Sequence, residues 1–370
     1  MRRTFTLALA IGGLLLATLS PATAAGSTAT GAVFTLSNSP SGNRVLMWER
    51  HTDGSLHPAG SVGTGGTGTG AGLGNQGALT LSPNYRWLYA VNPGSDEISV
   101  FRVSGAHLTL EDVAPSGGDL PISITARNRR VYVLHAGGNG SINGFDRSLS
   151  GQLTPIAGSM QPLSQAAAGP AQIEFSPDLD HLVVTEKATN RITFYDVDGA
   201  GVAGPPDSRA SAGQTPFGFA FTRDGTLVVS EAFGGAPDAS AASSYHFRPN
   251  GNLRLDSASV PTTETAACWV AITGDGRFAY LTNTGSGSVT GYAISDDGDL
   301  TRLDGNGVTG FAGAGSSPID ADFDRKSRRL YVLLAGSNAI AIFDRADDGS
   351  LTSIGQVTGL PAGANGLAAY

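Results

Sequence analysis

Short apolar segments alternate with polar turns along most of the chain. The clearest unit begins with the apolar segment 78–81, which is followed by a Ser-Pro-Asn turn. Residues 87–92, 97–103 and 107–113 then form three more segments that are rich in β-branched and aromatic residues. Alternation with a period of two residues, bounded by turn formers, predicts β-strands rather than helices. The unit is therefore predicted to be four consecutive strands.

The unit recurs seven times. Each copy contains a strand that ends in an aromatic residue, and successive aromatics lie 53, 44, 50, 50, 47 and 51 residues apart. These aromatics are Trp48, Phe101, Phe145, Tyr195, Tyr245, Tyr292 and Phe343. A period of this length with four strands and no helix is typical of a β-propeller blade.

Hairpin signals separate the strands. Asp-Gly or Asn-Gly pairs begin at residues 53, 224, 250, 275, 297 and 348, and they supply the positive φ that tight turns need. No helical segment joins consecutive strands, which argues against a parallel α/β fold. We predict an all-β, seven-bladed β-propeller made of four-stranded antiparallel blades.

The two ends of the chain indicate how the ring closes. The first unit starts at residues 31–34 without an innermost strand, and the last unit is followed by the extra segment 361–370. A strand from this C-terminal segment would complete the first blade and leave no open sheet edge. Residues 26–370 are therefore predicted to form a single domain.

The N-terminus has the pattern of an export signal. Arg2 and Arg3 precede an apolar run from Phe5 to Leu19, and the small residues that follow suit cleavage near Ala24 or Ala25. Residues 1–25 are thus predicted to be a cleaved signal peptide, and the general and twin-arginine export routes both stay open. We expect a secreted protein, extracellular or periplasmic, that is monomeric and not embedded in a membrane.

Composition narrows the possible chemistry. The chain has 52 glycines, 15% charged residues and a formal net charge of -8. An acidic protein is a poor partner for nucleic acid and for anionic membranes. Cys268 is the only cysteine, which excludes an intrachain disulfide and a zinc or iron-sulfur site built from cysteines. We expect no metal and no organic cofactor.

Candidate site residues lie where the second strand of each unit ends. If the units are equivalent, these residues surround one mouth of the central channel, and they are Asn38, Asn92, His135, Glu186, Glu231, Asn283 and Leu334. A histidine beside two glutamates is sufficient for general acid-base catalysis. The alternative is structural, since asparagine and carboxylate side chains at strand ends commonly accept backbone N–H groups.

Two glycine-rich segments lie outside the repeated strands. The connection at residues 232–239, after Glu231, is longer than its counterparts, so it is either a functional loop over the channel mouth or a tolerated insertion. Residues 63–77 contain a Gly-x-Gly-x-x-Gly match but open no helix, which argues against a phosphate-binding loop.

Three short segments resemble sequence motifs of the lactonase family of seven-bladed propellers. This family includes propeller-type 6-phosphogluconolactonases and is similar to carboxymuconate cyclases. The three segments are residues 175–178, 190–197 and 229–231. The resemblance implies that Arg191 and Glu231 match two family site residues. The Pro-Arg-His phrase of the family reads Pro216-Phe217-Gly218 here, and a second family histidine is replaced at Gln172.

The resemblance suggests an enzyme that hydrolyses or isomerises a small lactone or another neutral or weakly charged ligand. Glu231 would act as general base, Arg191 would stabilise the oxyanion, and His135 or Glu186 would position the substrate. Glu186, Asn92 and Asn283 are expected to contribute to substrate binding. The alternative is a non-enzymatic propeller that binds a ligand or a protein partner at the same mouth.

Overall fold

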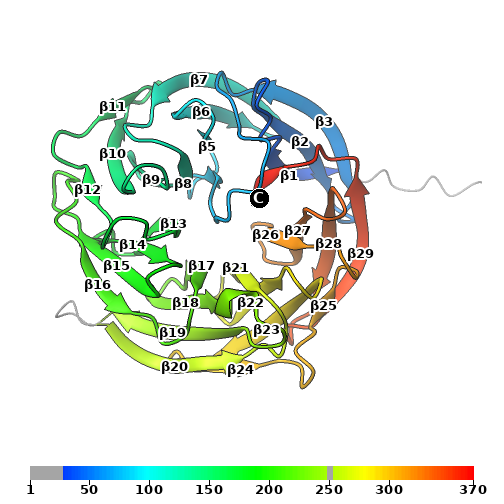
Figure 1. Cartoon of the computed structure of the whole chain (residues 1–370). Helices are drawn as coiled ribbons and strands as arrows, with labels where there is room; N and C mark the ends of the chain where they lie inside the picture. Colours follow the sequence, from blue (N-terminus) through cyan, green and yellow to red (C-terminus); the bar gives the residue numbers. More distant parts are fainter. Residues whose placement is uncertain (1–27, 248–252) are drawn as a thin grey trace, which may run out of the picture.

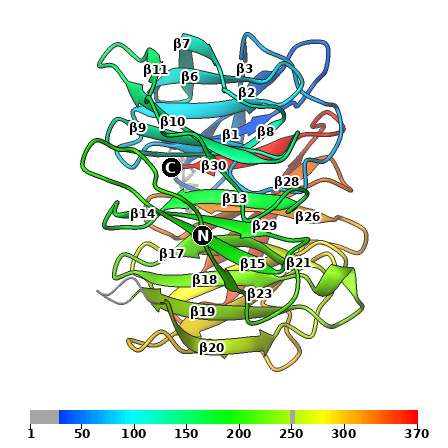
Figure 2. The ribbon, with the colours of Figure 1, turned by 60° about the vertical axis from the view of Figure 1, so that its left-hand side comes forward.

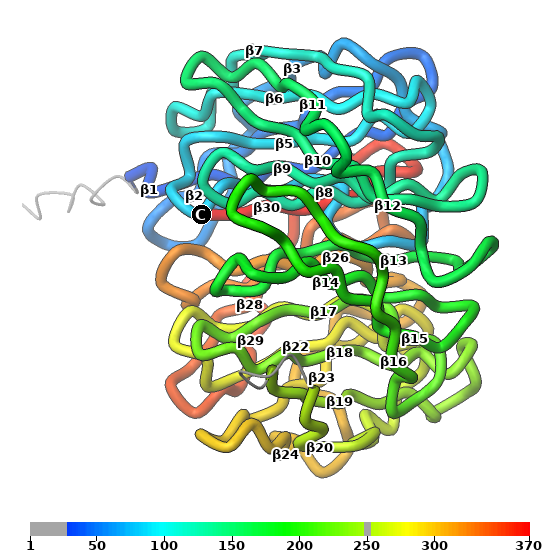
Figure 3. The backbone as a smooth tube through the Cα atoms, turned by 90° about the vertical axis from the view of Figure 1, so that its left-hand side faces the viewer, coloured from blue at the N-terminus to red at the C-terminus, as the bar shows by residue number. Residues whose placement is uncertain are grey.

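Seven antiparallel β-sheets surround a central channel in the computed structural model, which describes residues 28–247 and 253–370 (Figure 1). The predicted seven-bladed propeller is confirmed. Viewed from the side, the chain passes from blade to blade in sequence order (Figures 2 and 3). The predicted signal peptide and the turn at residues 250–251 lie outside the described residues.

The first blade combines strands from both ends of the chain. From the channel to the rim its order is β30, β1, β2 and β3. The bounds of these strands are β30 Asn365–Ala369, β1 Ala29–Leu36, β2 Arg44–His51 and β3 Leu56–Gly63.

Blades two to four each begin at the channel and run outward. The second blade contains β4 Leu79–Leu81, β5 Trp87–Asn92, β6 Glu97–Ser104 and β7 His107–Pro115. The third contains β8 Pro121–Arg127, β9 Arg130–His135, β10 Ser141–Arg147, β11 Leu153–Pro155 and β12 Gln161–Pro162. The fourth contains β13 Pro170–Phe175, β14 His181–Glu186, β15 Arg191–Asp196 and β16 Asp207–Ala210.

Blades five to seven repeat this order. The fifth contains β17 Pro216–Phe221, β18 Thr226–Glu231, β19 Ala241–Phe247 and β20 Leu253–Pro261, with a short 3₁₀ turn at Phe233–Gly235. The sixth contains β21 Ala267–Ile272, β22 Phe278–Asn283, β23 Ser288–Ile294, β24 Leu300–Arg302 and β25 Gly310–Phe311. The seventh contains β26 Pro318–Phe323, β27 Arg329–Leu334, β28 Ala339–Arg345 and β29 Leu351–Thr358.

The hydrophobic core lies between neighbouring blades. All seven repeated aromatics occupy the third strand of a blade and are buried. Tyrosines of the second strands connect one blade to the next: the ring of Tyr132 packs edge-on against Phe175 at 5.7 Å, and its hydroxyl donates to the carbonyl of Gly201 at 2.7 Å. Burial of each such side chain stabilises the fold by roughly 2–3 kcal/mol. None of the helical segments in the described part of the chain has the length and apolar character that crossing a membrane requires.

Closure of the ring depends on β30. It pairs antiparallel with β1, and the backbone groups of Ala32 and Tyr370 exchange two hydrogen bonds at 3.0 and 3.2 Å. The amides of Leu367 and Ala369 donate to the carboxyl groups of Asp320 and Asp322 in β26 at 3.0 and 2.8 Å. The C-terminal strand therefore joins the first blade to the seventh, as predicted, and Figure 1 shows this red strand beside β1.

Deletion of residues 366–370 is expected to destabilise the whole propeller, on the order of 5 kcal/mol, because it removes a buried strand and exposes the edge of β1. Thermal unfolding of the truncated and complete chains would measure the loss. Tyr370→Phe is the control, since it removes only the hydroxyl that donates to Gly105. An unchanged melting temperature after truncation would show that β30 does not close the ring.

Candidate functional site

The candidate ring residues share one place in the blades. Asn92, His135, Glu186, Glu231, Asn283 and Leu334 are each the last residue of a second strand, and Asn38 lies two residues beyond the end of β1. We call the end of the channel where the innermost strands begin the ring mouth. All seven residues lie at this level and all are buried, with at most 1% of their surface exposed.

Most of these side chains bind hydroxyl groups of the neighbouring third strand. Asn92 donates to Ser99 at 2.7 Å, and Asn283 donates to Thr290 at 2.9 Å. Glu186 accepts hydrogen bonds from Thr193 and Thr189, at 2.8 and 2.9 Å, and also from Ser164. These bonds tie each second strand to the outer part of its own blade.

Glu231 is enclosed in the same way. Its carboxyl group accepts hydrogen bonds from the backbone of Gly213 at 2.8 Å and from the hydroxyls of Ser243 and Ser259 at 2.5 and 2.7 Å. Burial raises the pKa of Glu231, while these three donors lower it. As folded, the side chain has no surface open to a substrate.

Arg191 and His135 have bonding partners other than Glu231. The guanidinium of Arg191 donates to the carbonyl of Ser208 at 3.5 Å. Burial lowers the pKa of His135, whose Nδ1 lies 3.3 Å from the Ser141 hydroxyl. Over the described residues, no ion pair or hydrogen bond joins any two of Glu231, Arg191 and His135. Their catalytic roles stay a prediction.

The ring mouth is crossed by residues 72–76, which we call the strap. The backbone of Gln76 donates to the carbonyl of Ala171 in β13 at 3.0 Å. Its side-chain amide exchanges two hydrogen bonds with Val270 in β21, at 2.8 and 3.0 Å. Asn75 donates to Ile122 in β8, and its carbonyl accepts from the indole of Trp269 at 2.7 Å. One loop from the first blade thus bonds to the third, fourth and sixth blades.

A partly buried lysine also holds the strap. The ammonium group of Lys187 donates to the carbonyl of Gly74 and lies 4.6 Å from the ring centroid of Phe217. Burial lowers the pKa of Lys187 to about 8. The sequence argues against a phosphate-binding role for the glycine-rich segment 63–77. In the structure, part of this segment closes one end of the channel.

The strap also accounts for a departure from the family pattern. Gly218 stands where the resemblance places a histidine. A Cβ atom at Gly218 would lie 2.1 Å from Oε1 of Gln76 and 2.6 Å from the carbonyl oxygen of Cys268. The side chain of Gln76 therefore fills the space that a residue-218 side chain would need.

An open cavity lies on the other side of Gln76. Its volume is about 490 Å³, and the hairpins that join the first and second strands of the blades form its mouth. Ser82, Tyr85, Arg127, Arg223 and Gly274 contribute to this rim. We call this end of the channel the hairpin mouth. Its volume is in the range that binds small molecules.

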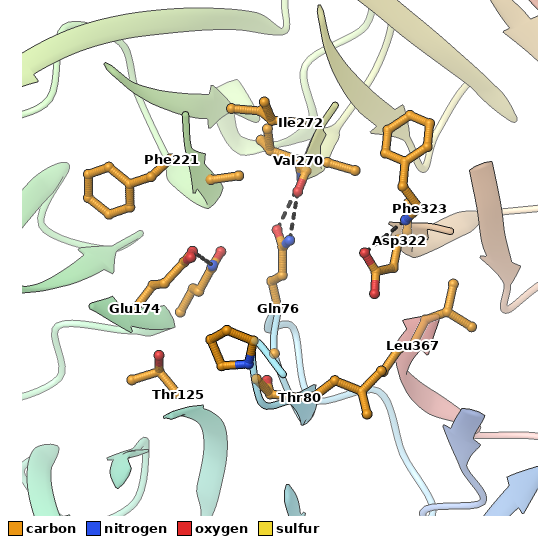
Figure 4. A pocket seen from close by; sticks show the side chains of 18 of the residues that line it. Gln76, Thr80, Thr125, Glu174, Phe221, Val270, Ile272, Asp322, Phe323 and Leu367 are labelled. Carbon is orange, nitrogen blue, oxygen red and sulfur yellow. Dashed lines mark hydrogen bonds between the residues drawn. The ribbon is translucent and has the colours of Figure 1, made fainter. Parts of the chain in front are cut away.

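Carboxyl groups line the walls of this channel cavity. Glu174 of β13 and Asp322 of β26 project from opposite walls, and Gln76 lies between them (Figure 4). Burial raises the pKa of Glu174 to about 7, although nearby Arg127 opposes this shift. Burial likewise raises the pKa of Asp322 to about 7 and that of Asp320 to about 8. The cavity therefore holds both protonated and ionised carboxyl groups near neutral pH.

These groups are not gathered as metal ligands. Within residues 28–247 and 253–370, no cluster of three or more histidine, cysteine, aspartate or glutamate side chains could hold a metal ion. The arrangement supports proton transfer to and from a bound molecule, which two carboxyl groups that titrate near pH 7 can perform from opposite sides.

Sequence reasoning missed the channel cavity, although a signal was present. Polar residues alternate along the innermost strands, at Ser123 and Thr125, at Gln172 and Glu174, and at Asp320 and Asp322. Because side chains of a strand alternate between its two faces, such pairs project to the same side. What the pattern does not reveal is that a loop from another blade closes the opposite end.

Comparison with known proteins identifies the relatives of this fold. The model of the lactonase family, described as a 7-bladed β-propeller, matches residues 41–162, 139–266 and 241–365. No curated protein matches the sequence.

Several solved structures are similar. One is a periplasmic gluconolactonase of Pseudomonas aeruginosa (17% identity, TM-score 0.68, 90% of this chain and 98% of that one). A candidate 6-phosphogluconolactonase of Bacteroides uniformis has 16% identity and a TM-score of 0.70 over the same shares of the two chains. A Lactobacillus plantarum protein has 17% identity and a TM-score of 0.71 over 92% of this chain and 98% of that one. At these identities the likeness shows the fold alone.

Gly218→Ala is expected to destabilise the protein by roughly 2–3 kcal/mol, because the added methyl group would overlap Gln76 and the backbone of residue 268. Urea unfolding would measure the change. Gly199→Ala is the matched control, since its Cβ would meet nothing within 4 Å, and it should alter stability by less than about 0.5 kcal/mol. Equal effects of the two substitutions would contradict the close fit of the strap.

The free energy of unfolding is expected to fall as pH rises from about 4 to about 8. The pKa of Asp320 is about 8 in the folded chain and near 3.8 when unfolded, so the folded state retains a proton that the unfolded state has released. Asp320→Asn should make the difference in melting temperature between pH 5 and pH 9 smaller by roughly 5 °C. Calorimetry at the two pH values tests this. If the melting-temperature difference in Asp320→Asn is as large as in the parent chain, groups other than Asp320 cause the pH dependence.

Proposed function

Because this chain belongs to the lactonase family of seven-bladed β-propellers, we propose that it hydrolyses a small lactone in the channel cavity at the hairpin mouth. The observation that carries the proposal is the pair Glu174 and Asp322, two carboxyl groups that face each other across that cavity and have pKa values of about 7. A carboxyl group is most effective as a base or an acid when its pKa is near the working pH.

The proposed reaction adds water to the lactone carbonyl. Ionised Glu174 takes a proton from water as the water oxygen bonds to the carbonyl carbon. Arg127 is the cation that acts on Glu174 in this cavity, and its guanidinium stabilises the oxyanion. Protonated Asp322 donates its proton to the ring oxygen as the carbon-oxygen bond breaks, and the product is a hydroxy acid.

The cavity also favours a neutral or weakly charged substrate. The hydroxyls of Thr80 and Thr125 and the amides of Gln76 and Gln172 line it together with the carboxyl groups. These groups match the hydroxyls of a polyhydroxylated lactone. Export of the mature protein, proposed from residues 1–25, would place this reaction outside the cytoplasm.

The ring mouth is the second location to test. Glu231 with Arg191 and His135 is the set that the sequence suggests, and Glu186, Asn92 and Asn283 are the associated binding residues. Glu231 is fully buried, and access to it would require displacement of the segment around Gly213, whose amide donates to its carboxyl group. If neither location is catalytic, the alternative is a propeller that binds a ligand or a protein without converting it.

Two matched substitutions distinguish these possibilities. Glu174→Gln is expected to lower kcat at least about 100-fold, because it removes the base, whereas Glu231→Gln leaves kcat within about twofold. Initial rates with glucono-δ-lactone and γ-butyrolactone, corrected for spontaneous hydrolysis, provide the measurement. In the parent chain kcat should be highest near pH 7 and fall on both sides, because the base must be ionised and the acid protonated.

Melting temperatures of both variants serve as the folding control. Loss of activity only in Glu231→Gln, with the fold intact, would move the site to the ring mouth. Equal rates in all three proteins, or no rate above the spontaneous reaction, would refute catalysis by either glutamate.

A further inference from the structure

A second cavity lies at the seam between the first and seventh blades. Its volume is about 560 Å³, and it is bounded by the start of β1, the turn between β2 and β3, and the hairpin between β26 and β27. Figure 1 shows these two blades side by side, in blue and orange. Half of its lining residues are cationic: Arg50, Arg325, Lys326, Arg328 and Arg329. We call it the seam cavity.

The positive charge of the residues that line this cavity is only partly neutralised. Asp324 is the only acidic lining residue, and its carboxylate accepts the amide of Arg328 at 2.8 Å and pairs with Arg50 at 3.5 Å. Arg329 pairs with Asp344 on the neighbouring strand. Over the described residues, Arg325, Lys326 and Arg328 have no carboxylate partner, although the chain as a whole carries a net charge of -8.

Part of the cationic lining is held in place. The side chain of Arg50 is 11% exposed, and its guanidinium also donates to the carbonyls of Tyr370 and Thr30 at 3.1 and 3.0 Å. The guanidinium of Arg325 lies 4.7 Å from the ring centroid of Tyr85. Nε of Arg329 is buried without a hydrogen-bond partner. Charged groups fixed before a ligand arrives lose less entropy on binding.

We propose that the seam cavity binds a compact oxyanion with two or more negative charges, such as a small molecule that carries a phosphate, a sulfate or several carboxylates. Guanidinium groups recognise such anions through paired hydrogen bonds, and the lysine adds a point charge. The volume suits a small molecule rather than a polymer segment. This site is separate from the channel cavity and goes beyond the proposed function, although Arg325 contacts Tyr85 of the channel rim.

Isothermal titration of the full chain with pyrophosphate and citrate tests the site. Both probes are expected to bind with Kd below about 1 mM, and acetate, a singly charged control, at least about tenfold more weakly at equal ionic strength. The double variant Lys326→Ala/Arg328→Ala should weaken binding of both probes by about tenfold or more. Arg277→Ala, which alters an exposed arginine of the corresponding hairpin in the sixth blade, should leave binding unchanged.

Three results would overturn the proposal: no binding of either probe, equal affinity for acetate, or the same loss in Arg277→Ala as in the double variant. The last two would indicate general screening of surface charge. None of these results depends on lactone hydrolysis. The proposal for the seam cavity and the proposal for the channel cavity can therefore be refuted independently.

Discussion

Closure of the ring without a covalent link is the constraint on which the rest of this structure depends. Every innermost strand has an edge that faces the channel, where its backbone groups need partners. Neighbouring blades supply these partners through side chains: Gln172 exchanges two hydrogen bonds with the backbone of Phe219, at 2.7 and 2.8 Å. Asp320 and Asp322 do the same for the C-terminal strand. The channel wall is therefore a continuous network rather than seven independent edges.

The same need explains why the two ends of the channel differ. Gln76 satisfies the backbone of Val270 from inside the channel, and this contact requires a glycine at position 218. Position 218 therefore carries no side chain, and Gln76 of the strap occupies that space and connects distant blades. For a small molecule that enters from the hairpin mouth, Gln76 forms the floor of the cavity and carboxyl groups line its walls.

Stability and chemistry are coupled in this channel. Asp322 accepts a backbone amide of the closing strand and also faces Glu174 across the cavity. Burial of the carboxyl groups costs stability at high pH, yet it brings their pKa values into the range where proton transfer is efficient. A residue that helps to close the ring is thus also the acid of the proposed reaction.

Much of the fold was predictable from the chain alone. The repeated aromatics, the Asp-Gly turns and the unmatched C-terminal segment determine seven blades and their closure, because strand period, turn conformation and edge pairing are local or repetitive properties. The ends of the second strands were also located correctly, apart from Asn38, which follows β1. Their environment was not predictable: Glu231 lies beneath Gly213, Ser243 and Ser259, and these partners come from loops and outer strands. Only the tertiary structure decided that residues 72–76 close one mouth, and that Glu174 and Asp322 lie on opposite walls of the cavity at the other, because these placements bring together residues that are 47 to 194 positions apart.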